Sequence, residues 1–292
     1  MTKKIKKRSV LFIAVLLILG VGFAVAVRDN TALMVSNYQV SSEKLPEEFD
    51  GFRIAQISDL HNAEFGEENI ELTILIEQNK PDIIVLTGDF IDSNRTDVNV
   101  VVSFAKKAVE IAPVYFAAGN HEERAYDSFV ELQEQLETCG VHVLRNNSII
   151  INRNGAEIQI CGVDDPAFAQ RRNPYSDANR EVELAIKLAA QPDLYTVLLS
   201  HRPELFEIYV ESGADLVFSG HAHGGQFRLP FVGGVVAPGQ GLFPEYDAGV
   251  FEENGTAMVV SRGLGNSIIP LRVNNRPELV VVTLNRTKKG IE

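Results

Sequence analysis

Apolar residues in this chain form short continuous runs that alternate with stretches of helical spacing. The runs at 54–57, 83–87 and 195–199 are short and rich in β-branched residues, which predicts strands buried on both faces. Between the runs, apolar residues recur at spacings of 3, 4 and 7, as in the segment 101–108, and this predicts amphipathic helices. Such alternation predicts parallel strands joined by right-handed crossovers, with their carboxyl ends along one edge of a sheet.

The same pattern predicts the remaining elements. Further strands are expected at 35–40, 114–118, 216–218, 257–261 and 279–284, and further helices at 70–77, 129–136, 181–190 and 205–211. Between 141 and 163, Asn and Gly divide the apolar pattern into short, hairpin-like strands. The segment 213–265 holds 12 of the 22 glycines, which indicates loops that form either a flexible surface or the rim of a substrate site.

The N-terminal residues differ from the rest of the chain. Five basic residues lie within the first eight positions, and 10–27 then carry no charge. This pattern favours an uncleaved membrane anchor over a cleaved signal peptide with its site near 24–26, and over a core helix. Either of the first two exports the rest of the chain, and the basic residues before the span predict an extracytoplasmic domain on the cell membrane. We divide the chain into an anchor (1–28), a linker with an edge strand (29–48), one main domain (49–285) and a polar tail (286–292).

The formal net charge of −12 is divided unequally along the chain. Six of the 27 basic residues precede Asp29, where there is no acidic residue, so the remainder carries 21 basic and 39 acidic side chains, or −18. A domain of this charge repels the phosphate backbone, and we expect no nucleic-acid partner. Any anionic substrate needs a locally positive site, which bound divalent cations would supply.

The two cysteines, Cys139 and Cys161, lack C-x-x-C spacing and cannot form a thiolate cluster. They either pair in one disulfide outside the cytoplasm or are two buried small residues. The pattern leaves both interpretations open. His142 lies apart from every motif and is expected to be a strand histidine.

Polar side chains follow the predicted strands. Five of the six histidines come after a strand, together with two aspartates and an asparagine; the set is Asp59, His61, Asp89, Asn120, His121, His201, His221 and His223. If strand geometry continues to His61, the side chains of Asp59 and His61 point the same way. Nitrogen and oxygen ligands without a thiolate suit Mn, Fe, Zn or Co, and eight groups are too many for one ion. The sequence therefore predicts two divalent ions that share a carboxylate, an arrangement used in phosphoryl transfer.

The order of these residues matches a known family. The blocks Asp59-x-His61, Gly88-Asp89, Gly119-Asn120-His121-Glu122, His201 and Gly220-His221-x-His223 resemble the calcineurin-like metallophosphoesterases. The segments 223–226, 241–244 and 261–265 look like the membrane-associated YkuE/YaeI branch, which is similar to enzymes that cleave the pyrophosphate of UDP-2,3-diacylglucosamine. The resemblance covers residues 52–284. Ala222 replaces the more usual Thr, a departure that should touch no ligand.

The resemblance implies a fold and a role for each residue. The fold is a four-layer α/β/β/α sandwich of two mixed sheets flanked by helices, behind the N-terminal membrane helix. One ion would take Asp59, His61 and His223; the second would take Asn120, His201 and His221; Asp89 would bridge them. Both ions would be divalent, with Mn favoured over Fe, Zn or Co. A hydroxide between the ions would attack phosphorus, and His121 would protonate the leaving group.

The anchor favours a lipid-linked or cell-envelope phosphodiester or pyrophosphate as the substrate. An extracytoplasmic nucleotide or a phosphoprotein is the alternative substrate. A protein of another class, a metal-stabilised binding module without catalysis, is disfavoured by the intact ligand set and by His121. Four arginines are candidates for binding phosphate or a head group; they are Arg202, Arg228, Arg262 and Arg272. The sequence gives no indication of the oligomeric state.

Overall fold

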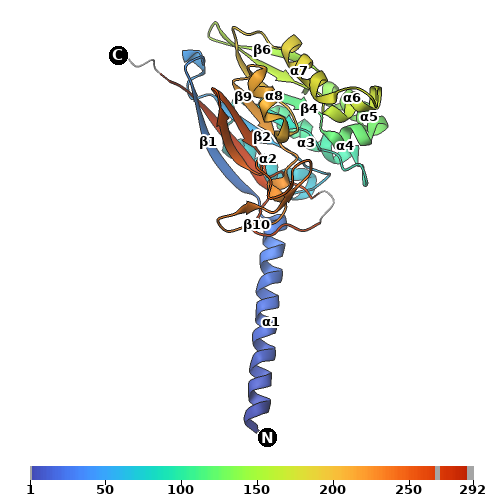
Figure 1. Ribbon diagram of the computed structural model, residues 1–292, viewed down its shortest axis with the longest axis vertical. Coiled ribbons are helices and arrows are strands. Elements are labelled where there is room, and N and C mark those ends of the chain that lie inside the picture. The colour runs from blue at the N-terminus through green and yellow to red at the C-terminus, as the bar shows by residue number, and fades with distance from the viewer. Residues whose placement is uncertain (1, 267–269, 288–292) are drawn as a thin grey trace.

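Two six-stranded sheets form the body of the protein in this computed structural model, which describes residues 2–266 and 270–287 (Figure 1). The first sheet has the order β1 (Met34–Ser42), β16 (Glu278–Arg286), β2 (Arg53–Ile57), β3 (Ile83–Thr87), β4 (Val114–Ala117), β5 (His142–Val143). The second has the order β14 (Gly249–Glu253), β15 (Thr256–Val260), β9 (Leu216–Ser219), β8 (Tyr195–Leu199), β7 (Ala156–Gly162), β6 (Asn147–Arg153). Strands β2 to β5 are parallel, as are β7, β8, β9 and β15.

Helices cover the outer face of each sheet. The first sheet packs against α2 (Ile70–Gln78), α3 (Val98–Ile111) and α5 (Tyr126–Thr138), and the second against α7 (Ala178–Ala189) and α8 (Phe206–Glu211). One apolar cluster lies between each sheet and its helices, and a further apolar cluster fills the space between the two sheets. These layers confirm the four-layer α/β/β/α fold with two mixed sheets.

The strand β3 is apolar from Ile83 to Leu86 because it is buried on both faces. Ile84 and Leu86 pack towards the helices, whereas Ile83 and Val85 pack into the cluster between the sheets. Successive side chains in a strand point to opposite faces. Both faces of this strand are buried, and its one polar residue, Thr87 at the end, accepts a hydrogen bond from Gln56 Nε2 at 3.0 Å.

Most predicted elements occur within a few residues of their expected bounds. The strand at 35–40 is β1, an edge strand, and the hairpin-like segment contains the antiparallel pair β6 and β7, joined through Asn154 and Gly155 with positive φ at both. Sequence patterns did not predict the short helices α4 (Asn120–Arg124) and α6 (Pro166–Arg172). They also did not predict β14 or the two-residue strands β10 (Arg228–Leu229), β11 (Gly233–Gly234), β12 (Val236–Ala237) and β13 (Gly241–Leu242).

The N-terminal helix α1 (Thr2–Thr31) projects from the body as a single rod (Figure 1). The segment Phe12–Thr31 of this helix is long enough and apolar enough to cross a membrane. Exposed apolar side chains along it include Phe12, Leu17 and Phe23, which argues against a core helix. The division of the chain at residues 28, 48 and 285 stays a prediction, and residues 288–292 of the expected polar tail lie outside the described residues.

Both cysteines are free thiols in the structure, so the two are not joined in a disulfide. Cys139 is half-buried at the end of α5. Cys161 lies in β7, and burial raises the pKa of its thiol to about 12. His142 lies in β5, where its ring stacks on Tyr115 with 5.1 Å between centroids, as expected for a strand histidine.

Candidate metal centre

The predicted metal ligands converge where strands of both sheets end. Those on the first sheet follow β2, β3 and β4, and those on the second follow β8 and β9. All eight predicted side chains are buried: Asp59, His61, Asp89, Asn120, His121, His201, His221 and His223. The parallel strands thus bring together residues more than 160 positions apart, such as Asp59 and the backbone N–H of His221 that donates to it at 3.1 Å.

The loop that carries Asp59 and His61 corrects one expectation. Strand β2 ends at Ile57, and both residues adopt left-handed conformations with φ of 52° and 46°. The two side chains therefore converge through a tight loop and not through strand alternation. A left-handed residue costs about 1–2 kcal/mol. The conformation is held by hydrogen bonds from the Asp59 N–H to the Gly88 carbonyl and from the His61 N–H to the Asp89 carbonyl, both 3.0 Å.

Two glycines are required by close packing at the site. A Cβ on Gly119 would collide with the carboxylate of Asp89, and a Cβ on Gly220 would collide with the hydroxyl of Ser58. In the blocks Gly119-Asn120 and Gly220-His221, glycine is therefore required because no larger residue fits at these two positions. They let the loops that carry ligands approach one another.

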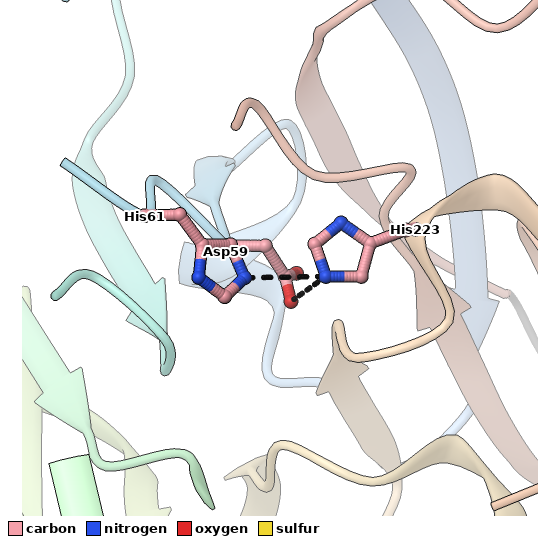
Figure 2. A group of neighbouring side chains, drawn as sticks. All are labelled: Asp59, His61 and His223. Atoms are coloured by element: carbon pink, nitrogen blue, oxygen red, sulfur yellow. Dashed lines mark hydrogen bonds and ion pairs between the residues drawn. The ribbon is translucent and has the colours of Figure 1, made fainter. Parts of the chain in front are cut away.

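One group of ligand atoms is formed by Asp59, His61 and His223 (Figure 2). The Nε2 atoms of the two histidines are 3.2 Å apart, and His223 Nε2 is 3.4 Å from Asp59 Oδ1. Ligands about 2.1 Å from one ion, at angles between octahedral and tetrahedral, lie about 3.0–3.4 Å from one another. The three side chains are therefore already spaced as neighbours around one divalent ion.

A second group is formed by Asp89, His201 and His221. His201 Nε2 lies 3.1 Å from Asp89 Oδ2 and 3.1 Å from His221 Nδ1, which is again the spacing of ligands around one ion. Asn120 Oδ1 is buried and has no hydrogen-bond partner among the described residues. An amide oxygen in this state suits a metal ligand, because a buried acceptor without a partner is otherwise costly.

Asp89 lies between the two groups. Its Oδ2 atom is 3.1 Å from His201 Nε2 and 3.8 Å from His61 Nε2, while its Oδ1 accepts the backbone N–H of His121 at 2.7 Å. Burial opposes the charge of this carboxylate, but the imidazoles of His201 and His61 outweigh burial and lower its pKa well below the usual value. One ionised carboxylate thus faces both groups.

The histidine rings direct one nitrogen each at the site, and His61 and His223 are neutral. His201 Nδ1 donates to the Thr87 carbonyl at 2.7 Å, which leaves Nε2 directed at the site. His221 directs Nδ1 at the site, and its Nε2 is 3.9 Å from Glu204 Oε1. The Thr87 carbonyl thus fixes the tautomer of His201, whereas His221 Nε2 has no hydrogen-bond partner among the described residues. Burial lowers the pKa of His61 and of His223 to about 3, so both rings are neutral and keep a lone pair at neutral pH.

His201 differs from the other rings in its charge. Burial opposes protonation, but the carboxylates of Asp89 and Asp59 outweigh it and raise the pKa of His201 to about 10. A metal ion needs the neutral ring, so it would take the place of this proton. Asp89, the carboxylate that contributes most to holding this proton, is the group that would also bind the cation in its place.

His121 lies in a third group of ligand atoms, with His61 and Asp89. Its ring meets the ring of His61 edge to face, with 4.5 Å between centroids. Its Nδ1 accepts the backbone N–H of Ser93 at 3.0 Å and is 3.9 Å from Asp92 Oδ1. When Nδ1 accepts this bond, the proton of the neutral ring is on Nε2, which lies 3.5 Å from Arg124 Nη1. The ring can therefore present a proton from Nε2, although its role as the general acid stays a prediction.

Three carboxylates around the site were given no role by sequence reasoning. Glu122 accepts backbone N–H groups from Gly119, Asp89, Phe90 and Ile91, so it holds the loop that carries the shared carboxylate. Asp92 faces His121, and Glu204 faces His221. Asp92 and Glu204 each lie three residues after a ligand, Asp89 and His201, but that spacing alone has no chemical meaning in a loop.

The four arginines all have partners within the protein. Arg202 makes two bonds to Asp165, at 2.7 and 3.1 Å, and Arg228 pairs with Asp247 at 3.0 Å. Arg262 lies 3.6 Å from Glu278. Arg272 is fully buried and donates to backbone carbonyls of the same loop, so its placement does not favour contact with a substrate. Phosphate binding by these residues stays a prediction.

Comparison with known proteins agrees with this geometry. The family profile of the calcineurin-like phosphoesterases matches residues 52–225. The chain is 31% identical over 273 residues to the metallophosphoesterase YkuE of Bacillus subtilis (strain 168), covering 92% of this chain and 91% of that protein. It is 29% identical to the phosphodiesterase YaeI of Escherichia coli (strain K12), covering 80% and 82%. It is also 29% identical to a transmembrane protein with a metallophosphoesterase domain from Danio rerio, covering 86% and 57%.

The chain belongs to the calcineurin-like phosphoesterase family. This confirms the resemblance, including its YkuE/YaeI branch, and the prediction of a metal-dependent phosphoric ester hydrolase with a divalent metal centre. A membrane helix candidate and a relative named as a transmembrane protein support membrane association. The number and identity of the ions, the role of each ligand and the orientation in the membrane stay predictions.

Proposed function

We propose that this protein is a dinuclear hydrolase of a phosphodiester or pyrophosphate bond in a lipid-linked or cell-envelope substrate. The observation that carries the proposal is the position of Asp89 Oδ2, which lies 3.1 Å from His201 Nε2 in one group of ligand atoms and 3.8 Å from His61 Nε2 in the other. Asp59, His61 and His223 would hold one ion, and Asn120, His201 and His221 would hold the other. Mn is the favoured metal, because imidazole and oxygen ligands without sulfur suit it.

Two divalent ions at these positions would lower the pKa of a water molecule and offset charge on the phosphoryl oxygens. The protein's own groups would do the rest. The ionised Asp89 would balance both cations, and Glu122 would fix that carboxylate through the backbone of its loop. His121 would hold a proton on Nε2 beside the leaving oxygen, since Ser93 occupies its other nitrogen.

The membrane helix supports a substrate at the membrane. With the basic residues before the span in the cytoplasm, the domain after Arg28 would lie on the extracytoplasmic side. The name of the relative YaeI, a phosphodiesterase, supports a diester over a monoester. The alternative substrates are an extracytoplasmic nucleotide and a phosphoprotein, and the sequence does not favour one of these two over the other.

The test is a substrate panel on the full chain in detergent with added Mn. We expect turnover of a nitrophenyl diester or of a lipid-linked nucleotide pyrophosphate to exceed that of a nitrophenyl monoester. Higher turnover of the monoester or of a phosphopeptide would contradict the substrate class. Absence of turnover on every member, with two bound ions, would instead support the non-catalytic binding module.

A further inference from the structure

Exposed apolar side chains gather on two small hairpins that follow the predicted ligand His223. These hairpins are β10–β11 and β12–β13. Their exposed apolar residues, which we call the apolar tip, are Leu229, Phe231, Val232, Leu242 and Phe243, with exposed fractions of 48%, 108%, 59%, 71% and 61%. Single exposed apolar residues are common on soluble proteins, but a group of this size marks a contact surface.

The two hairpins form one surface. The Phe243 N–H donates to the Val235 carbonyl at 2.8 Å, and the Val235 N–H donates to the Phe227 carbonyl at 2.8 Å. Asp247 Oδ2 accepts from the Gly234 N–H and from Arg228, 2.5 and 3.0 Å away, which holds the first hairpin from its other side. The apolar tip is therefore carried by a hydrogen-bonded frame and not by separate loops.

This frame is continuous with the end of the membrane helix. The Arg228 N–H donates to the Val273 carbonyl at 3.0 Å. The neighbouring Arg272 N–H donates to Asn30 Oδ1 at 3.0 Å, and Asn30 Nδ2 donates to the Arg272 carbonyl at 3.2 Å. The last turn of α1 is thus bonded to the segment that lies beside β10. Figure 1 shows the β10 hairpin at the end of the body from which α1 projects.

The apolar surface of α1 ends at the level of these contacts. Val25 and Val27 are exposed, whereas Asp29 is buried against the body, where its carboxylate accepts the Asn274 N–H. A bilayer that covers the apolar part of the helix would therefore have its surface near Arg28. Phe, Leu and Val side chains at that level are suited to the boundary between head groups and acyl chains.

We propose that the apolar tip is a second membrane contact, which inserts into the lipid surface beside α1. The contact is apolar in character: the chain after residue 28 carries a charge of −18, and the one arginine of these hairpins, Arg228, is paired with Asp247. Two contacts fix the tilt of the body on the membrane, which one helix alone cannot do. This inference goes beyond the proposed function and does not require hydrolysis.

The contact also fixes the metal centre relative to the bilayer. His223 lies five positions before Arg228, and its carbonyl accepts from Asn275 Nδ2 at 2.7 Å. The same segment carries Leu271, whose carbonyl accepts from Gln226 Nε2 at 2.8 Å. A predicted metal ligand and the apolar tip therefore share one hydrogen-bonded frame. The centre would face the head groups at a constant height.

The test uses the absence of tryptophan from this sequence. A Phe231→Trp variant of the full chain, reconstituted in phosphatidylcholine vesicles, carries one fluorophore on the apolar tip. We expect blue-shifted emission and loss of most of its intensity when the lipid is brominated in the acyl chains near the head group. The matched control is Tyr175→Trp, an aromatic position 96% exposed on the loop between α6 and α7, which should keep its intensity.

Three results would contradict the proposal. If Phe231→Trp is as insensitive to brominated lipid as Tyr175→Trp, the apolar tip is in water. If its emission is blue-shifted but insensitive to brominated lipid, protein covers the tip, for example a second copy of the chain. Raising the salt concentration should leave the quenching unchanged, because an apolar contact is not screened; a loss of quenching would contradict the apolar character. None of these readouts measures hydrolysis, so their failure is distinct from a failure of the proposed function.

Discussion

Substitution of His121 tests the chemistry assigned to the site. The His121→Ala variant removes the Nε2 proton but none of the side chains that we assign to an ion, so we expect both ions to stay bound. Loss of a general acid lowers the rate by about 10² to 10⁴, or ~3–5 kcal/mol of transition-state stabilisation. The loss should be smallest for a nitrophenyl ester, because nitrophenolate leaves readily without a proton, and largest for an alkyl or sugar ester.

The structure also predicts what this substitution costs in stability. The buried ring is lost, and the Ser93 N–H loses its acceptor, a cost of about 1–3 kcal/mol. This is less than the 5–15 kcal/mol of a typical domain, so the variant should fold. His121→Asn is the matched control, because an amide oxygen can accept the Ser93 N–H but the side chain has no group at the Nε2 position.

The assay compares turnover of wild type, His121→Ala and His121→Asn on both kinds of ester at saturating Mn. We expect both variants to be slow, and slowest on the alkyl ester. If His121→Asn restores activity, the ring acts by holding the loop at Ser93. If both esters lose activity equally, the proton comes from elsewhere and the assignment of His121 is wrong.

Three further predictions address the ions and the anchor. Removal of divalent metal with a chelator should abolish turnover, and added Mn or Co should restore it; full activity in excess chelator would refute a metal mechanism. Asp89→Asn should lose tight binding of both ions, because the amide cannot balance two cations, and metal analysis showing two ions in this variant would exclude the bridge. Removal of residues 1–28 should give a soluble, active domain, because this deletion keeps the hydrogen bonds between Asn30 and Arg272. Removal of residues 1–33 also deletes Asn30 and should lower the melting temperature of the domain. An aggregated product of the 1–28 deletion would show that the leader packs into the body.

The strands and the ligand set could be predicted because each has a local cause. Strand β3 is apolar from Ile83 to Leu86 because both of its faces are buried. Ligands that follow parallel strands lie close together because the carboxyl ends of these strands are along the same edge of the sheet. The order of Asp59, Asp89, His201 and His223 therefore predicted one site from sequence alone.

The loops could not be predicted, because their geometry depends on contacts distant in sequence. Asp59 and His61 adopt left-handed conformations that their own sequence disfavours, and bonds to the loop after β3 hold them there. Glu204 lies near His221 because the strands that precede them, β8 and β9, are adjacent in the sheet, and no local sequence pattern predicts this contact. The hairpins at 228–243 have no periodicity, since each strand has two residues.

The most direct test of a dinuclear centre is to count the ions and to measure the coupling between them. Metal-free protein is titrated with Mn(II), and bound Mn per chain, turnover and the electron paramagnetic resonance spectrum are followed together. Two ions about 3.5–4 Å apart should be magnetically coupled. We predict two bound ions per chain, a coupled spectrum and turnover that rises as the second ion binds. One bound ion with an uncoupled spectrum at full turnover would contradict the account.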